Sequence, residues 1–304
     1  MPIRVASAPV SWGIMENREP PRGFTYARVL DEIAKAGFTG TELGPYGFLP
    51  INVKQLQGEL ESRGLQMCSA FVAFELGNKS THATGLEQVE RTAELIASLG
   101  AKVLVLSDEI TPERAAVAGR RDEANRASWS DAEWRVADEA IADVIRACAE
   151  KNLRVAFHHH VGSHVETPEE IDRLFSLPSV PELGLCLDTG HCFYGGGEPF
   201  KVLRKYGARL RALHLKDIDA AVLKKVRAKR TGFHDAVTQG VFAALGQGSI
   251  NFPELLKELE ENGYDGWAVV EQDVLEGGTG ADMALANATA ARNYLKQLGV
   301  NGEA

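Results

Sequence analysis

The stretch LRVAFHHHVGSHVETPEEIDRLFSLPSVPELGLCLD, residues 153–188, contains one complete repeat of the pattern that predicts the fold of this chain. It opens with an apolar run at 153–158 and closes with another at 183–188, each of strand length. Between them, residues 168–176 have helical periodicity, and Thr167 offers an N-cap just before a first-turn proline and two glutamates. The stretch therefore predicts a strand, a helix and a second strand.

Runs of the same kind recur along the chain and alternate with amphipathic segments. The strand-like runs are residues 3–8, 40–44, 65–71, 102–107, 153–158, 183–188, 210–215 and 267–272. The predicted helices lie near residues 25–36, 52–63, 86–98, 131–150, 168–176, 198–206, 253–262 and 281–298. Eight alternations, with strands that are apolar on both faces, predict a parallel (β/α)₈ barrel, the TIM-barrel fold.

An open doubly wound sheet is the competing α/β architecture. It would place a glycine-rich phosphate loop after the first strand, and SAPVSWGIMEN (7–17) has no GxGxxG motif. No repeat, low-complexity linker or composition break divides the chain, so residues 1–304 are predicted to form a single domain. Two connections, 108–130 and 216–251, are long enough to be lids or interface segments. The second contains the basic run KKVRAKR (224–230), which fits a solvated helix face as well as a phosphate- or partner-binding role.

Composition and charge narrow the class of protein. Of the 304 residues, 44% are hydrophobic and 25% are charged, which is typical of a globular protein with a large core. The net charge of −9 argues against nucleic acid or an anionic membrane as the main partner, and no apolar run approaches the roughly 20 residues of a membrane helix. There is no signal-peptide pattern, and the four cysteines form no CxxC motif. We therefore expect a cytoplasmic protein with reduced thiols that binds neither nucleic acid nor membrane.

Polar residues gather at the ends of the predicted strands, where a TIM barrel has its active site. Six of the eight runs end in or beside acidic residues or histidine: Glu42, Ser107-Asp108-Glu109, His158-His159-His160, Asp188 with His191, His214-Leu215-Lys216-Asp217, and Glu271. Such side chains are rarely buried without a partner. Their convergence predicts a bound ion or a polar ligand at this end of the barrel.

The last four strands are neighbours around the barrel, so His158, Asp188, His214 and Glu271 can point at one metal ion. Imidazole and carboxylate donors without cysteine suit Mn²⁺, Co²⁺ or Mg²⁺, and Zn²⁺ is a further candidate. Strand alternation divides the histidine triplet: His158 and His160 face the mouth of the barrel, and His159 packs outward. We expect the remaining histidines away from the strand ends to be structural, namely His82, His164 and His234.

Several motifs resemble those of the xylose-isomerase-like barrels, which include sugar epimerases, hydroxypyruvate isomerase and endonuclease IV. These motifs are CLDTGH (186–191), HLKD (214–217), LGQGSINF (245–252) and GWAVVEQD (266–273). The resemblance implies a metal site of Glu, Asp, His and Glu at the ends of strands five to eight. Here AFH (156–158) stands where most members have glutamate, and His158 takes the first of these positions.

A second set of motifs resembles the inosose dehydratase branch of this family over essentially the whole chain. The set consists of APVSWG (8–13), GTELG (40–44), FHHHVG (157–162) and DTGH (188–191). The resemblance implies a hydro-lyase of inositol catabolism that uses Mn²⁺ or Co²⁺ to convert 2-keto-myo-inositol, a small keto-polyol, into 3D-trihydroxycyclohexane-1,2-dione. By family analogy it also implies a homodimer or homotetramer.

Dehydration of a β-hydroxy ketone needs a base for the proton next to the carbonyl and a group that protonates the leaving hydroxyl. His160 and His191 are the candidate acid/base pair, because imidazole titrates near neutral pH. Lys216 is a candidate donor to the ketone or enolate oxygen, with a surface lysine as the alternative, and Glu271 is expected to serve both the metal and catalysis. Three further residues are expected to bind ring hydroxyls or to form a wall of the pocket: Trp12, Glu42 and Glu166.

Other functions fit parts of the pattern. The same metal site would serve a sugar isomerase or epimerase, or a lyase of a 3-keto-glycoside, although two-base epimerisation would lack the strand-five glutamate. A DNA-repair nuclease with three zinc ions would need histidines on strands two and three, where this chain has Glu42 and Ala70-Phe71. A non-catalytic sugar-binding barrel would keep its ligand when His158 or Glu271 is replaced by alanine.

Overall fold

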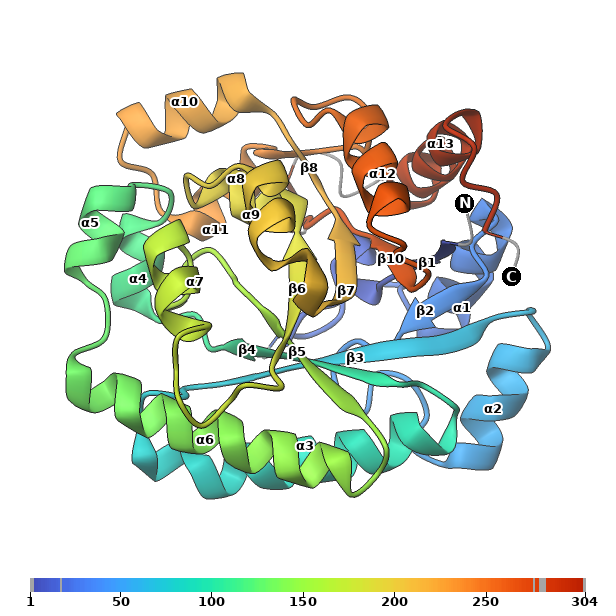
Figure 1. Cartoon of the computed structure of the whole chain (residues 1–304). Coiled ribbons are helices and arrows are strands. Elements are labelled where there is room, and N and C mark those ends of the chain that lie inside the picture. The colour runs from blue at the N-terminus through green and yellow to red at the C-terminus, as the bar shows by residue number, and fades with distance from the viewer. Residues whose placement is uncertain (1–2, 17, 276, 279–282, 303–304) are drawn as a thin grey trace.

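Eight parallel strands close into a barrel in the computed structural model, which describes residues 3–16, 18–275, 277–278 and 283–302 (Figure 1). In chain order they are β1 (Arg4–Ser7), β2 (Gly40–Glu42), β3 (Gln66–Phe74), β4 (Val103–Asp108), β5 (Arg154–His158), β6 (Gly184–Asp188), β7 (Leu210–Leu215) and β10 (Trp267–Val270). Each strand pairs with its neighbour in this order, and β10 closes the barrel on β1. The predicted (β/α)₈ barrel is confirmed.

The helices around the barrel begin and end at signals that are present in the sequence. They are α1 (Tyr26–Ala36), α2 (Val53–Glu61), α3 (His82–Ser98), α6 (Asp131–Ala149), α7 (Pro168–Leu174), α9 (Pro199–Tyr206), α12 (Phe252–Glu261) and α13 (Ala284–Gln297). The predicted cap is confirmed, because Thr167 accepts from the Glu170 N–H and the Glu170 carboxylate accepts from the Thr167 N–H. Gly37 ends α1 with a φ of 93°, which favours glycine. All eight predicted helices are present, although residues 281–282 of the last lie outside the described residues.

The two long connections contain structure that the sequence did not predict. Residues 108–130 form α4 (Pro112–Val117) and α5 (Arg121–Arg126). Residues 216–251 form α10 (Ala220–Ala228) and α11 (Phe233–Thr238), flanked by β8 (Asp217–Ile218) and β9 (Phe242–Ala243), which pair antiparallel. Figure 1 shows α4, α5, α10 and α11 on one side of the molecule, and α11 packs on α4. The two insertions therefore meet each other.

Asp217 gives the HLKD and glycine-rich motifs a structural role. Its carboxylate accepts hydrogen bonds from the backbone N–H groups of Gly246 and Gly248, both at 2.9 Å, and of Ile218 and Ile250. A Cβ atom at residue 248 would lie 2.3 Å from Asp217 Oδ1, so only glycine fits there. The carboxylate thus holds the loop before α12 against the end of β7.

The interior of the barrel is filled mainly by small side chains, with Trp267 and Phe71 packed against them. Two buried clusters of alternating strand residues occupy the interior: Ala6, Ala8, Cys68 and Val269 in one, and Val105, Ala156, Cys186 and Ala212 in the other. Val155 and Phe157 belong to the outer core, as strand alternation predicted. All four cysteines are buried and none is paired with another.

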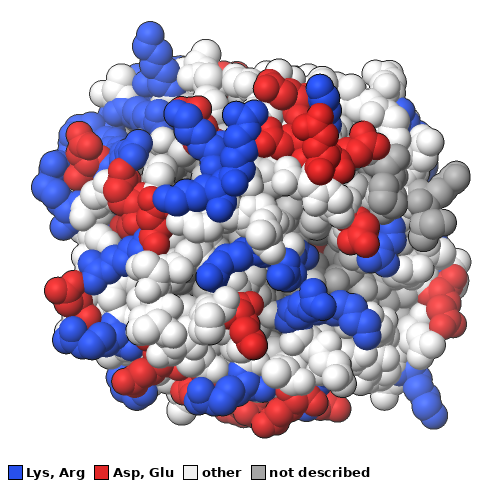
Figure 2. All heavy atoms as spheres, in the orientation of Figure 1, with Lys and Arg blue, Asp and Glu red and all other residues white. Residues whose placement is uncertain are grey.

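The surface carries charges of both signs in alternation, and Figure 2 shows basic side chains next to acidic ones over the region of α10. Within the run 224–230, Arg227 donates to the Tyr194 carbonyl and Arg230 pairs with Glu123 at 2.6 Å, while the three lysines are exposed. The arginines of the run therefore attach α10 to its neighbours. Of the helices in the described residues, none has both the length and the apolar character that crossing a membrane requires.

Candidate metal and catalytic site

The ends of β5, β6, β7 and β10 bring the four predicted metal ligands together. The Nε2 atom of His158 lies 3.4 Å from Oδ2 of Asp188, and Nδ1 of His214 lies 3.9 Å from the same oxygen. Nδ1 of His214 is also 3.2 Å from Oε2 of Glu271. All four side chains are buried, and the register explains their approach, because Asp188 pairs directly with His214 and Val269 pairs with His214 two residues before Glu271.

Glu42 reaches the same cluster from β2, on the far side of the His214 ring. Its Oε1 atom is 3.3 Å from Nε2 of His214 and accepts a hydrogen bond of 2.7 Å from the Ser69 hydroxyl. The imidazole of His214 is therefore held between two carboxylates, Glu42 and Glu271. Although burial acts in the opposite direction, these carboxylates and the Cys186 thiol hold the pKa of His214 well above its ordinary value.

Lys216 is buried among three carboxylates, so the alternative of a surface lysine does not apply. Its Nζ atom lies 3.2 Å from Asp188, 3.1 Å from Glu271 and 2.8 Å from Asp273. Burial alone would lower the pKa of Lys216, but these three carboxylates hold it well above the ordinary value. The ammonium group is therefore charged and lies beside the predicted metal ligands.

His160 and His191 form a second group, with Asp273. Their ring centroids are 3.9 Å apart, and Nε2 of His191 lies 3.4 Å from Oδ2 of Asp273. Burial, together with the Lys216 ammonium, holds the pKa of His160 below its ordinary value, and burial with His160 lowers the pKa of His191 further. Both rings are therefore neutral at neutral pH.

The backbone of Val161 assigns opposite tautomers to these two rings. Nδ1 of His160 lies 2.8 Å from the Val161 carbonyl oxygen, so it carries the proton, and Nε2 is left with a lone pair. Nδ1 of His191 accepts from the Val161 N–H at 3.2 Å, so its proton is on Nε2 and faces Asp273. The pair therefore offers one bare nitrogen and one N–H donor.

The donor chemistry of the first group fits a divalent cation. Four carboxylates, those of Glu42, Asp188, Glu271 and Asp273, surround the single ammonium of Lys216 and the His214 ring. This leaves negative charge that a divalent ion would neutralise. In addition, Nδ1 of His158, Oδ2 of Asp188 and Nδ1 of His214 form no well-aligned hydrogen bond among the described residues, although Asp188 and His214 have charged neighbours at 3.2 Å, which is unusual for buried polar atoms. The second group fits an ion less well, because Nε2 of His191 carries a proton.

One cavity of about 360 Å³ at the mouth of the barrel is lined by members of both groups, namely His158, His160, His214, Lys216, Glu271 and Asp273. Asp188 and His191 are fully buried and lie outside this lining, so the predicted direct contact of His191 with substrate is corrected. Its charged lining consists of Glu16, Arg18, Glu42, Asp108, Glu109, Lys216, Glu271 and Asp273, and its histidines are His158, His160, His214 and His234. Phe71, Phe233, Val237 and Leu275 add an apolar wall. Burial raises the pKa of Glu16 to about 7, so this carboxyl group exchanges its proton near neutral pH.

Two of the residues predicted to bind substrate do not line this cavity. Trp12 lies in a 3-10 helix (Pro9–Trp12), where its side chain is buried and its indole N–H donates to Glu32 Oε2 on α1 at 2.6 Å. Glu166 is buried behind the loop that follows β5, where it accepts from the backbone N–H groups of Gly119 and Gly162. Both assignments to substrate binding are therefore corrected, because protein partners already use the polar atoms. Glu42, the third such residue, does line the cavity.

The position of Glu166 leads to a pH-dependent prediction. Burial raises the pKa of Glu166 from 4.5 to about 7, although the Gly162 N–H and Arg114 act against it. The folded state still holds the Glu166 proton at pH values at which a glutamate in the unfolded chain has lost it. The stabilisation from this proton is therefore complete below pH 4.5 and is lost as the pH rises through about 7. The variant Glu166→Gln lacks this titration, so its unfolding free energy should decrease less than that of the wild type between about pH 5 and about pH 8. Urea titrations at both pH values measure this, and an equal decrease in the two proteins would contradict the raised pKa.

Several residues at the site were not found from the sequence. Asp273 had a signal, because it lies two residues after Glu271 and so shares its direction in an extended chain. Phe233 and His234 come from α11, and Glu16 and Arg18 from the connection after β1, where no periodic pattern identifies them. His159 is buried and does not line the cavity, in agreement with the predicted alternation.

Fold and site together define a class: a parallel TIM barrel with candidate metal ligands at the carboxyl ends of its last four strands. The sequence profile of the xylose isomerase-like TIM barrel family matches residues 30–297, and the chain belongs to that family. Among its relatives are the inosose dehydratases of Clostridium beijerinckii, 32% identical over 302 residues, and of Serratia proteamaculans, 32% identical over 305 residues. Each alignment covers 97% of both proteins.

Solved structures with the same fold are more distant in sequence. One is the IOLI protein with a bound zinc atom, with a TM-score of 0.71, 16% identity, and coverage of 97% of this chain and 98% of that one. Another is the probable 3-DHS dehydratase AsbF of Bacillus anthracis, with a TM-score of 0.68, 15% identity, and coverage of 95% and 98%. These likenesses establish the fold alone.

Proposed function

We propose that this protein is a metal-dependent hydro-lyase that removes water from 2-keto-myo-inositol and forms 3D-trihydroxycyclohexane-1,2-dione. The observation that carries the proposal is that one cavity is lined by three of the four candidate metal ligands, His158, His214 and Glu271, and by an imidazole with a bare Nε2, that of His160; the fourth ligand, Asp188, lies 3.4 Å behind His158. The similarity to inosose dehydratases over 97% of the chain supports the choice of substrate.

The metal would be held by His158, Asp188, His214 and Glu271, with Glu42 supporting His214 from behind. Two imidazoles and two carboxylates without a thiolate favour Mn²⁺ or Co²⁺, and Mg²⁺ and Zn²⁺ are weaker candidates. A divalent cation in this position supplies the positive charge that makes the carbon next to a ketone acidic enough to lose a proton. Lys216, charged and directed into the same cavity, adds a second positive group.

His160 suits an elimination from one face of the ring. Nε2 of His160 takes the proton next to the ketone, and the same nitrogen then returns it to the neighbouring hydroxyl, which leaves as water. His191 lies outside the cavity lining and supports the His160 ring at a centroid distance of 3.9 Å, while Val161 and Asp273 keep its own proton on Nε2. Because one nitrogen both removes and returns the proton, both transfers take place on the same side of the substrate.

The charges in the cavity favour a neutral polyol over an anionic substrate. Six carboxyl groups line it against two cationic side chains, Arg18 and Lys216, and Lys216 is already paired with two of them, Glu271 and Asp273, and with the buried Asp188. Arg18 is exposed. A carboxylate-bearing ring would meet repulsion here, whereas carboxylates accept hydrogen bonds from ring hydroxyls.

The substrate assignment is tested by incubating metal-stripped protein with 2-keto-myo-inositol, and then adding Mn²⁺. We expect the diketone to accumulate only after the metal is added, and we expect 3-dehydroshikimate, a carboxylate-bearing ring, to remain unchanged under the same conditions. Chromatography with mass detection separates both pairs of compounds. Mn²⁺-loaded protein that forms no diketone would refute the proposal, and turnover of 3-dehydroshikimate instead would reassign the substrate.

A further inference from the structure

A single peptide unit connects His160 to a buried carboxylate that does not line the cavity. The Val161 carbonyl accepts from Nδ1 of His160 at 2.8 Å, and the N–H of the same peptide, on Gly162, donates to Oε2 of Glu166 at 2.8 Å. In a trans peptide the C=O and N–H groups point in opposite directions, so the two bonds leave opposite edges of one plane. The Glu166 carboxylate is therefore connected to the His160 imidazole through the carbonyl group of Val161 and the nitrogen of Gly162.

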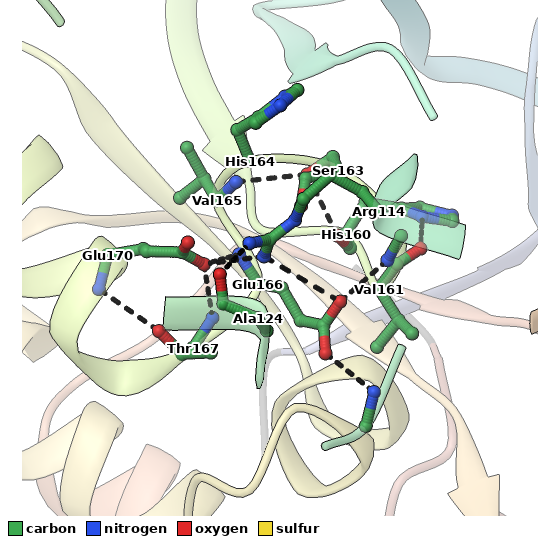
Figure 3. Close-up of polar contacts among 12 residues, drawn as sticks. Arg114, Ala124, His160, Val161, Ser163, His164, Val165, Glu166, Thr167 and Glu170 are labelled. Atoms are coloured by element: carbon green, nitrogen blue, oxygen red, sulfur yellow. Dashed lines mark hydrogen bonds and ion pairs between the residues drawn. The ribbon is translucent and has the colours of Figure 1, made fainter. Parts of the chain in front are cut away.

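Glu166 is held in place by two separate segments of the chain, the loop after β5 and the connection that contains α4 and α5. Its other oxygen, Oε1, accepts from the Gly119 N–H at 2.7 Å, which ties the segment between α4 and α5 to the loop after β5. Figure 3 shows Glu166 beside Arg114, which is fully buried and lies 3.9 Å from Glu166 Oε2. The Arg114 guanidinium also donates to the Ser163 carbonyl and to Glu170 Oε2, at 2.7 Å and 2.9 Å.

The loop between Glu166 and His160 has little freedom to turn. The His160 N–H donates to the Val165 carbonyl, and the Ser163 hydroxyl donates to the His160 carbonyl. Gly162 has a φ of 87°, which favours glycine, and its carbonyl accepts from the Thr111 N–H at the start of α4. The orientation of the Val161–Gly162 peptide is thus determined by the hydrogen bonds at its C=O and at its N–H, and by the bond to the Gly162 carbonyl that follows it.

We propose that Glu166 is a positioning residue that acts through the Val161–Gly162 peptide to keep the proton of His160 on Nδ1. The negative charge of Glu166 beside the Gly162 N–H polarises the peptide and makes the Val161 oxygen a stronger acceptor. A stronger acceptor at this position retains the Nδ1 proton and leaves Nε2 bare toward the cavity. The charged or titratable groups that face Glu166 are Arg114, Glu170, Tyr194 and Arg227. Burial raises the pKa of Glu166 to about 7 although the arginines favour its charged form, so the carboxylate carries its charge above that pH.

The chemistry of this cluster suits positioning better than stabilisation. A buried ion pair of this kind adds little stability compared with apolar residues of the same volume, because removing the charges from water is costly. A carboxylate with two backbone N–H groups and a guanidinium at fixed positions does, however, determine the geometry of its neighbours. Glutamine in its place would accept at one oxygen only and turn its NH₂ group toward the second N–H.

The test uses the variant Glu166→Gln, with Glu169→Gln as the matched control. Glu169 is three residues along the chain, on α7, and its half-exposed carboxylate pairs with Arg121 away from the cavity. Imidazole nitrogen spectra of ¹⁵N-histidine-labelled protein, recorded with diamagnetic Zn²⁺ at a pH above 7.5, report the tautomer, and His160→Gln assigns the signal. We expect His160 to hold its proton on Nδ1 in the wild type and in Glu169→Gln, and to shift partly to Nε2 in Glu166→Gln.

A second experiment measures kinetics and depends on the proposed function. In Glu166→Gln we expect kcat for 2-keto-myo-inositol to fall about 10- to 100-fold with KM nearly unchanged, as for other outer residues that orient a catalytic group. An unchanged tautomer in Glu166→Gln, or a fall in melting temperature with kcat equal to that of the control, would overturn the inference. If Glu166→Gln does not fold, the wild-type spectrum decides, since a proton on Nε2 of His160 would also overturn it. The tautomer measurement does not depend on turnover. Absence of a diketone product would therefore refute the proposed function and leave the inference about Glu166 intact.

Discussion

Replacing Asp188 by asparagine is expected to lower kcat for 2-keto-myo-inositol by about 10³-fold, because loss of the cation removes several kcal/mol of stabilisation from the developing enolate. Oδ2 of Asp188 lies near Nε2 of His158 and Nζ of Lys216, at 3.4 Å and 3.2 Å, so this oxygen joins the donors on both sides. Asparagine keeps the size of the side chain and can still cap α8 (Thr189–Tyr194), where Oδ1 accepts from the His191 N–H at 2.7 Å. The fold should therefore survive the change.

The measurement combines turnover at saturating Mn²⁺ with the metal content of the purified protein. Chelator treatment of the wild type should abolish activity reversibly, and Asp188→Asn should neither retain metal nor regain activity. The control is Asp138→Asn, a nearly buried aspartate on α6 that accepts from the Ser179 N–H and lies outside the cavity. An Asp188→Asn protein with stoichiometric metal and more than a tenth of the activity would reject the assignment of this residue.

Replacing Arg114 by methionine should lower the free energy of unfolding by about 3–5 kcal/mol. The guanidinium is fully buried and forms the ion pair with Glu170, and it donates to the carbonyl groups of Ala124 and Ser163. Methionine fills most of the volume but removes the cation that pairs with the buried Glu170 carboxylate, which keeps only its backbone N–H donors. It also removes the guanidinium donor of the Ser163 carbonyl. The cost therefore comes from an uncompensated buried charge and a lost donor and not from a cavity.

Urea denaturation compares this variant with Arg121→Met, which removes a half-exposed arginine from the same connection. Arg121 pairs with Glu169 at the surface, and its loss should change stability by about 0–1 kcal/mol. If the two variants have the same stability, the buried network contributes no more than a surface ion pair. A double variant with Glu170→Gln should recover part of the loss, because it removes the carboxylate that was left unpaired.

The barrel, and the convergence of the candidate metal ligands at one end of it, were predictable because both follow from local pattern. Strand runs end at Asp188 and His214, and a parallel barrel brings such ends to one face whatever the helices between them do. Alternation along β5 was sufficient to separate His158 and His160 from His159. These predictions require only the end point of each strand and the alternation of its side chains, and no knowledge of contacts between distant residues.

The remaining features depend on contacts between distant residues. Trp12 follows a strand end, as the candidate site residues do, but its indole pairs with Glu32 on α1, which no spacing indicates. Glu166 lies on the correct loop, yet its partner Gly119 comes from an insertion 47 residues earlier. The short helices α4, α5 and α11 have too few turns for a periodic pattern to be detected, so the cavity wall and Arg114 had no signal.

The groups that orient His160 and His191 belong to the main chain of Val161, and this has a consequence for mutagenesis and for directed evolution. Any ordinary substitution at residue 161 keeps the same carbonyl and N–H, so a saturation library there would report how well a side chain packs. Proline is the exception, because it lacks the N–H that His191 accepts. Substitutions that change which nitrogen carries the proton must therefore be sought among residues behind the loop. A library restricted to cavity-lining positions would not include these residues.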